Sequence, residues 1–114
     1  MKVINTKLQG CVVIEPKVFG DKRGFFLEAF NVDRYADLLG LKKPFVQDNH
    51  SHSNRGVLRG LHLQRNNPQG KLVRVVRGAV FDVAVDLRAG SQTYGQWASV
   101  ILSEETKNQL WLPP

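Results

Sequence analysis

Val80-Phe-Asp-Val-Ala-Val-Asp-Leu87 is the stretch that decides the fold class, because its side chains alternate with the period of a β-strand. One face of this strand would carry large apolar side chains, and the other small and acidic ones. The two sets are Phe81, Val83, Val85 and Leu87, and Val80, Asp82, Ala84 and Asp86. The second set suits the inner wall of a ligand-holding barrel, with a solvated outer face as the alternative.

Short β-rich runs bounded by Gly and Pro flank this stretch, at spacings typical of an all-β sandwich or barrel. A helix is expected over residues 33–39, with Asp33 as its N-cap and Gly40 as its C-cap. Residues 103–106 are expected to form a capped turn. We predict strands at 11–15, 24–30, 45–52, 57–64, 71–77, 80–87, 96–102 and 109–112. No repeat or linker interrupts the pattern, so residues 1–114 are expected to form one domain.

The composition limits the classes of protein to consider. Sixteen Lys and Arg against ten Asp and Glu give a net charge of +6, which fits a phosphorylated small molecule, nucleic acid or simple solubility. The arginines are scattered and no nucleic-acid motif is present, so DNA binding is not expected. The single cysteine, Cys11, is expected to be a small buried hydrophobe. Without a signal sequence or an uncharged apolar run, we expect a soluble cytoplasmic protein and no membrane partner.

His62 is the strongest candidate for chemistry, since it lies in sequence between Arg59 and Lys71. Imidazole is suited to proton transfer near neutral pH, and nearby cations favour an anionic ligand or developing negative charge. A single histidine on a strand is nevertheless more often structural than catalytic. Strict alternation would send Arg59 and His62 to opposite faces, so the functional interpretation requires a β-bulge at Gly60.

Other candidate sites are weaker when taken alone. His50 and His52 imitate a metal-binding pair, but the chain lacks the further ligands that a metal needs, so no metal is expected. Arg23, in a turn, could grip a phosphate through its forked guanidinium. The run Gln47-Asp48-Asn49 offers polar groups that could bind a base or sugar edge.

Together these segments are more specific than any one of them. Their order along the chain resembles the dTDP-4-dehydrorhamnose 3,5-epimerase family over essentially all of its length. The segments are Asp21-Lys-Arg-Gly24, Gln47-Asp-Asn-His50, Gly56-Val-Leu-Arg-Gly-Leu-His62, Gln69-Gly-Lys-Leu-Val-Arg74, Val80 to Leu87 and Gln109-Leu-Trp-Leu-Pro113.

The resemblance implies a cupin-type jelly-roll barrel with one short helix, and a homodimer in which strands near the N-terminus cross to the partner. It also implies an enzyme that needs neither metal nor organic cofactor. Its substrate would be a thymidine-diphosphate-linked 4-keto-6-deoxyhexose, inverted at C3 and C5 in dTDP-L-rhamnose biosynthesis. Two alternatives stay open: an epimerase that acts at one centre only, and a non-catalytic cupin module that binds a nucleotide sugar.

The resemblance also assigns roles to particular residues. His62 would be the general base, and Lys71 would bind substrate and stabilise the enolate as charge moves onto O4. Arg59 would hold the diphosphate or the sugar. The nucleotide would be contacted by Arg23 and Glu28 of the partner subunit, and by Gln47, Asp48 and Asn49. Asp82 faces the expected cavity without an assigned role.

The family pattern continues beyond the Trp-Leu-Pro segment, so the domain is expected to be incomplete in this chain. The missing part would carry a second histidine, the tyrosine that reprotonates the sugar from the opposite face, and the aspartate that orients the base. Neither Tyr35 nor Tyr94 matches the position of that tyrosine.

We therefore predict that the 114-residue chain alone does not epimerise the dTDP-4-keto sugar, because inversion needs an acid on the face opposite His62. A turnover assay that follows formation of the dTDP-L-rhamnose precursor checks this expectation. Measurable product from the chain alone would contradict it.

Overall fold

Two antiparallel sheets form the larger part of the structure, a computed structural model that describes all residues 1–114. The first sheet has the strand order β1-β2-β8-β5, with bounds β1 Lys2–Asn5, β2 Val12–Glu15, β5 Lys71–Arg74 and β8 Gln109–Leu112. β8 is hydrogen-bonded on both edges, so Leu110 lies opposite Val13 on one side and Val73 on the other. Segments far apart in the chain therefore meet on this one central strand.

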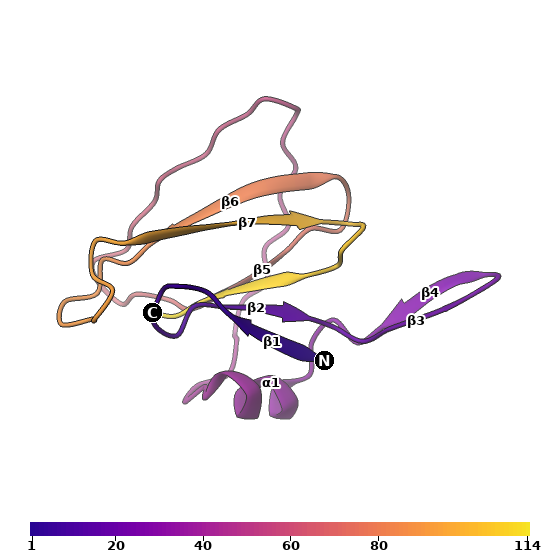
Figure 1. Ribbon diagram of the computed structural model, residues 1–114, viewed down its shortest axis with the longest axis horizontal. Coiled ribbons are helices and arrows are strands. Elements are labelled where there is room, and N and C mark those ends of the chain that lie inside the picture. Colours follow the sequence, from indigo (N-terminus) through magenta and orange to yellow (C-terminus); the bar gives the residue numbers. More distant parts are fainter. The chain divides into compact units, whose positions relative to one another are not determined.

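The second sheet is a ribbon of two strands, β6 (Ala79–Val85) and β7 (Trp97–Ser103), which pair along their whole length. The ribbon lies over the first sheet as a separate layer, as Figure 1 shows. A further hairpin, β3 (Val18–Asp21) and β4 (Gly24–Leu27), projects away from the two layers (Figure 1). Its phenylalanines are largely exposed, Phe26 to 70%.

The hydrophobic core lies between the two sheets. Leu8, Cys11, Leu102 and Leu110 form its buried centre, and Ala84, Ala98 and Val100 pack against them from the ribbon. Phe81, on the opposite face of β6, is 67% exposed. The face of β6 that carries Asp82 and Ala84 is therefore the inner face of the sandwich. Of the two possibilities left open by the sequence, an inner wall and a solvated outer face, the structure shows the first. Cys11 is a buried hydrophobe, as predicted, and burial raises the pKa of its thiol.

The chain divides into two compact units, Met1–Glu28 with Gln64–Pro114, and Ala29–Leu63. The second unit contains α1 (Val32–Leu39), whose Gly40 C-cap adopts the left-handed conformation at φ 62°. Its N-cap is Asn31, which accepts a hydrogen bond from the Arg34 amide at 3.0 Å. Tyr35 is buried, and its hydroxyl donates to the Ala29 carbonyl at 2.9 Å. Figure 1 shows α1 as the short coil, and it is far too short to cross a membrane.

The prediction of a largely β chain with one short helix is confirmed, but several elements differ from their expected bounds. β1 and β3 were not predicted, and the helix cap is Asn31 instead of Asp33. The predicted strands 45–52 and 57–64 are wrong: both segments are irregular in this chain. Their pattern suits a strand, but a strand needs a hydrogen-bonded neighbour, and no other segment pairs with either of them. The β-bulge expected at Gly60 is absent for the same reason.

A network around Asp86 joins the loop after β1 to the turn between β6 and β7. Asp86, 4% exposed at the end of β6, accepts hydrogen bonds from Nε and Nη2 of Arg88, both at 2.9 Å. The hydroxyls of Ser91 and Thr93 donate to the same carboxylate at 2.5 and 2.6 Å. Arg88 Nη2 also donates to the Gln9 carbonyl, which ties the loop after β1 to the β6–β7 turn. Arg88 and these hydroxyls hold the pKa of Asp86 well below its usual range.

Replacing Asp86 with Asn should lower the free energy of unfolding by about 3 kcal/mol at pH 7, because Arg88 then keeps a partly buried charge without its partner. The native carboxylate has a lowered pKa, so its contribution is complete above the unfolded-state pKa of about 4 and declines below it. The stability gap between the variants should therefore narrow as the pH falls from 6 to 3. Urea unfolding across that range measures it.

The hairpin provides a matched control, since Asp21 and Arg23 repeat the same Asp-x-Arg spacing on an exposed surface. Asp21→Asn should cost far less stability, because water screens that pair. Equal losses in the two variants would show that burial of Asp86 is not what makes its network stabilising.

Candidate functional site

His62 lies in the second unit, on the irregular segment that follows the Arg55–Gly56 turn, and its side chain is exposed. Two residues earlier, Gly60 has φ +106°, a conformation that side chains rarely adopt. A Cβ at Gly60 would also lie 3.4 Å from the His62 amide nitrogen. The glycine therefore permits the backbone path that presents the imidazole, and the neighbouring Leu61 and Leu63 are exposed as well.

The other predicted residues of the second unit are also exposed. Arg59 donates from Nη2 to the His52 carbonyl at 2.9 Å, which links two parts of the segment. Gln47 donates from Nε2 to Oδ1 of Asn49 at 3.0 Å, and Asp48 lies between them. These contacts leave free donors on the guanidinium and free acceptors on the Asp48 carboxylate for a ligand.

Lys71 begins β5 in the first unit, opposite Leu112 of β8. Its ammonium donates to Oε1 of Gln69 at 2.5 Å. Gly70, between them, lies directly against the Trp111 ring, where an added Cβ would approach Cζ3 to 2.8 Å. This close contact fixes the backbone from which Lys71 projects.

Arg23 and Glu28 belong to the projecting hairpin and its C-terminal end. Arg23 Nη2 pairs with Oδ2 of Asp21 at 2.6 Å, and this bond lowers the pKa of Asp21. The Arg23 side chain stays 90% exposed, so its remaining donors face solvent. Glu28 is half-buried.

The predicted site residues thus fall into two groups. Five lie in the second unit and three in the first. The second unit holds His62, Arg59, Gln47, Asp48 and Asn49, and the first holds Lys71, Arg23 and Glu28. No three His, Cys, Asp or Glu side chains gather into a group that could hold a metal ion.

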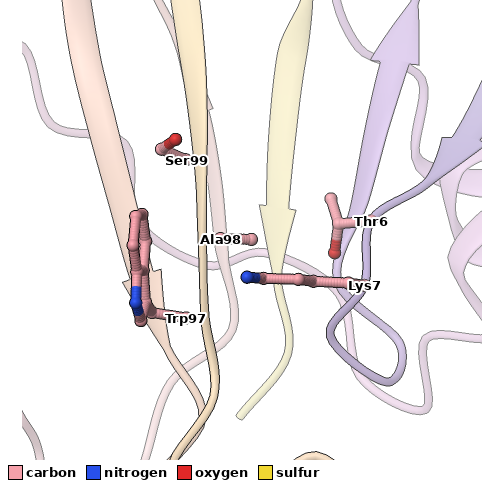
Figure 2. A pocket seen from close by; sticks show the side chains of 5 residues that line it. All are labelled: Thr6, Lys7, Trp97, Ala98 and Ser99. Atoms are coloured by element: carbon pink, nitrogen blue, oxygen red, sulfur yellow. The ribbon is translucent and has the colours of Figure 1, made fainter.

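An open cavity of about 420 Å³ lies between the end of β1 and the start of β7, and none of the predicted site residues lines it. Figure 2 shows the Lys7 side chain extending toward the indole of Trp97, with Thr6, Ala98 and Ser99 around it. The Lys7 ammonium lies 5.0 Å from the centroid of the Trp97 ring, within the range of a cation–π contact.

Known proteins resemble this chain closely in sequence and in structure. The dTDP-4-dehydrorhamnose 3,5-epimerase of Salmonella typhimurium is 58% identical, over 99% of this chain and 62% of that protein. A crystal structure from Legionella pneumophila, described as dTDP-6-deoxy-D-glucose-3,5-epimerase in complex with dTDP-4-keto-L-rhamnose, is 58% identical and superposes with a TM-score of 0.94, over 98% of this chain and 60% of that one. A Bacillus anthracis dTDP-4-dehydrorhamnose 3,5-epimerase with TDP and pyrophosphate bound is 45% identical, with a TM-score of 0.88, over 98% of this chain and 65% of that one.

These neighbours confirm the fold class, an all-β cupin-type jelly roll with one short helix. The sequence profile of the dTDP-4-dehydrorhamnose 3,5-epimerase family matches residues 5–114, and the chain belongs to this family. The resemblance inferred from the motifs is therefore confirmed. The chain spans less than two thirds of the length of the relatives described above.

Replacing Gly70 with Ala should destabilise the first unit by about 1–3 kcal/mol, because the new methyl group overlaps the Trp111 ring and forces one of them to move. Chemical denaturation followed through tryptophan fluorescence measures both the stability and the displacement of the indole. Gly20→Ala is the matched control, since its Cβ would meet only an ordinary 3.7 Å contact. If Gly70→Ala is as stable as Gly20→Ala, the close contact does not constrain β5.

Proposed function

We propose that the protein is a dTDP-4-dehydrorhamnose 3,5-epimerase, which inverts C3 and C5 of dTDP-4-dehydro-6-deoxyglucose on the way to dTDP-L-rhamnose. Membership of the family, together with the ligand bound to the Legionella pneumophila relative at 58% identity, supports this substrate most directly. The chain covers 62% of the Salmonella typhimurium relative and 60% of the Legionella pneumophila chain, so the activity is proposed for the whole protein.

The chemistry follows from the ketone at C4. A carbonyl group makes the hydrogens on the two neighbouring carbons removable, provided that the resulting enolate oxygen is stabilised. His62 takes the proton as general base, for which imidazole is suited near neutral pH. The Lys71 ammonium stabilises the charge that develops on O4. Inversion is completed when an acid on the opposite face of the sugar returns a proton to the carbon, a role that the family resemblance gives to a tyrosine beyond the Trp-Leu-Pro segment. Only protons move to and from carbon in this mechanism, so it uses neither a metal nor an organic cofactor.

Substrate binding uses further exposed polar residues, each of which is assigned by the family resemblance. Arg59 binds the diphosphate or the sugar, since a guanidinium can form paired hydrogen bonds with oxyanions. The stretch 47–49 contacts the nucleotide with amide and carboxylate groups. Arg23 and Glu28 contact the nucleotide of the partner subunit's site. The exposed donors of Arg23 at the hairpin support this assignment.

The proposal includes a homodimer that exchanges N-terminal strands and works in the cytoplasm. The exposed apolar side chains of the β3–β4 hairpin support such a dimer, because they form a surface suited to burial against another subunit. Phe19, Phe25 and Phe26 are 53%, 63% and 70% exposed. The single reduced and buried cysteine agrees with a reducing compartment.

Replacing His62 with Asn in the whole protein should reduce turnover of the dTDP-4-keto sugar by roughly 10²–10⁴-fold, because the general base is lost while the side chain keeps its polarity. Proton NMR in deuterium oxide measures the exchange at C3 and C5 and gives the product's configuration. His52→Ala is the matched control, an exposed histidine of the same unit to which the mechanism gives no role.

Three outcomes of this experiment separate the alternatives. Exchange and inversion at both carbons, lost only in His62→Asn, support the 3,5-epimerase. Inversion at one carbon would replace it with a single-centre epimerase. Binding of dTDP without exchange in the unmodified protein would replace it with a non-catalytic nucleotide-sugar-binding module.

A further inference from the structure

Asp82 is an acid on the inner wall of the sandwich that no contact within the chain engages. Asp82 lies on β6, opposite Val100 of β7, and Ala84 follows it on the same face of β6. The side chains of Val100 and Ala84 both pack against the core. Burial raises the pKa of the Asp82 carboxyl. The other acid of this face, Asp86, is fully bound by Arg88, Ser91 and Thr93. Asp82 is half-buried, and a cation or hydrogen-bond donor inside the sandwich would stabilise its partly desolvated carboxyl.

The facing sheet carries such a cation. Lys71 lies on the same face of β5 as Val73, and opposite Leu112 of β8. The side chains of Val73 and Leu112 both pack against the core. The stem of Lys71 therefore starts on the inner face, by the alternation of side chains along a strand. The Lys71 ammonium donates a hydrogen bond to Oε1 of Gln69, and it makes no other polar contact.

The strand pairings place Cys11 level with Lys71 in the first sheet, and Asp82 acts electrostatically on Cys11. Val12 lies opposite Trp111, so Cys11 falls in the row of Leu112 and Lys71. Burial is the main cause of the raised pKa of the Cys11 thiol, and the Asp82 carboxylate is near enough to raise it further by its charge. Packed sheets are about 10 Å apart, a gap that the four-carbon stem of a lysine and an aspartate can bridge together.

We propose that the Asp82 carboxylate receives the Lys71 ammonium inside the sandwich and positions it for the 4-keto oxygen of the substrate. The inference rests on the proposed function and adds a residue to it. Asp82 is then a positioning residue: it acts on the substrate only through Lys71. The ammonium has two resting places, Gln69 at the rim and Asp82 on the inner wall, and only the second points it at the reacting sugar.

Kinetics of a double-mutant cycle in the whole protein test the coupling. Asp82→Asn should lower kcat by roughly tenfold to a hundredfold, because the ammonium is misplaced, and change KM less than about twofold. In a Lys71→Met background the same substitution should have no further effect. Glu105→Gln, an exposed acid of the β7–β8 turn, should leave kcat unchanged. An equal loss of kcat in the presence and absence of Lys71 overturns the inference.

A second measurement needs no substrate, so it separates this inference from the epimerase proposal. An amine-reactive ester, followed by mass spectrometry, should label Lys71 several-fold faster in Asp82→Asn than in the unmodified protein. Lys2, paired with Glu15 on the surface, should react at the same rate in both. Unchanged labelling of Lys71 overturns the inference, whether or not the protein turns over the sugar. Faster labelling without turnover keeps the Asp82–Lys71 pair and removes only the epimerase. If Asp82→Asn does not fold, Asp82→Ala serves, because the adjacent Ala84 shows that this wall accepts a methyl group.

Discussion

The pairing of β8 between β2 and β5 is the constraint on which the larger unit depends. Gln109–Leu112 is bonded on one side to residues near the N-terminus and on the other to the segment that carries Lys71. Leu110 on one face and Trp111 on the other are both buried, so this short strand contributes to the packing of both faces of its sheet. Bringing such distant segments together costs conformational entropy. The pairing of β2 and β5 with the same central strand, β8, offsets that cost only when the whole sheet forms.

The Asp86 network closes the opposite layer by a different kind of interaction. The same Asp-x-Arg spacing occurs twice in the chain, at Asp21 and at Asp86, with similar hydrogen bonds from the arginine. Only the second pair is enclosed and receives two additional hydroxyl donors. The same local motif therefore forms an exposed ion pair in the hairpin and a buried, stabilising one at the β6–β7 turn. The two differ in how strongly they stabilise the fold because only the second is shielded from water.

The proposed chemistry is divided between a rigid scaffold and an irregular segment. Lys71 and Asp82 stand on strands whose positions the core fixes, whereas His62 and Arg59 project from exposed backbone. This division is common in enzymes, where a packed sheet positions one part of the site and loops supply the rest. The proposed pairing with Lys71 would give the inner wall of β6 a function, since a carboxyl such as Asp82 is costly to bury in a purely structural core.

The sequence alone determined the features that depend on neighbouring residues: the alternation of 80–87, the Gly40 cap, the capped turn after β7 and the burial of Cys11. The motif order was also sufficient to indicate the family. The structure decided what depends on distant partners. Segments 45–52 and 57–64 have strand-like patterns but remain irregular, because a strand exists only where another strand completes its hydrogen bonds. Likewise, the inward direction of Asp82 followed only from the sheet that packs against β6, since alternation defines two faces but not which of them is buried.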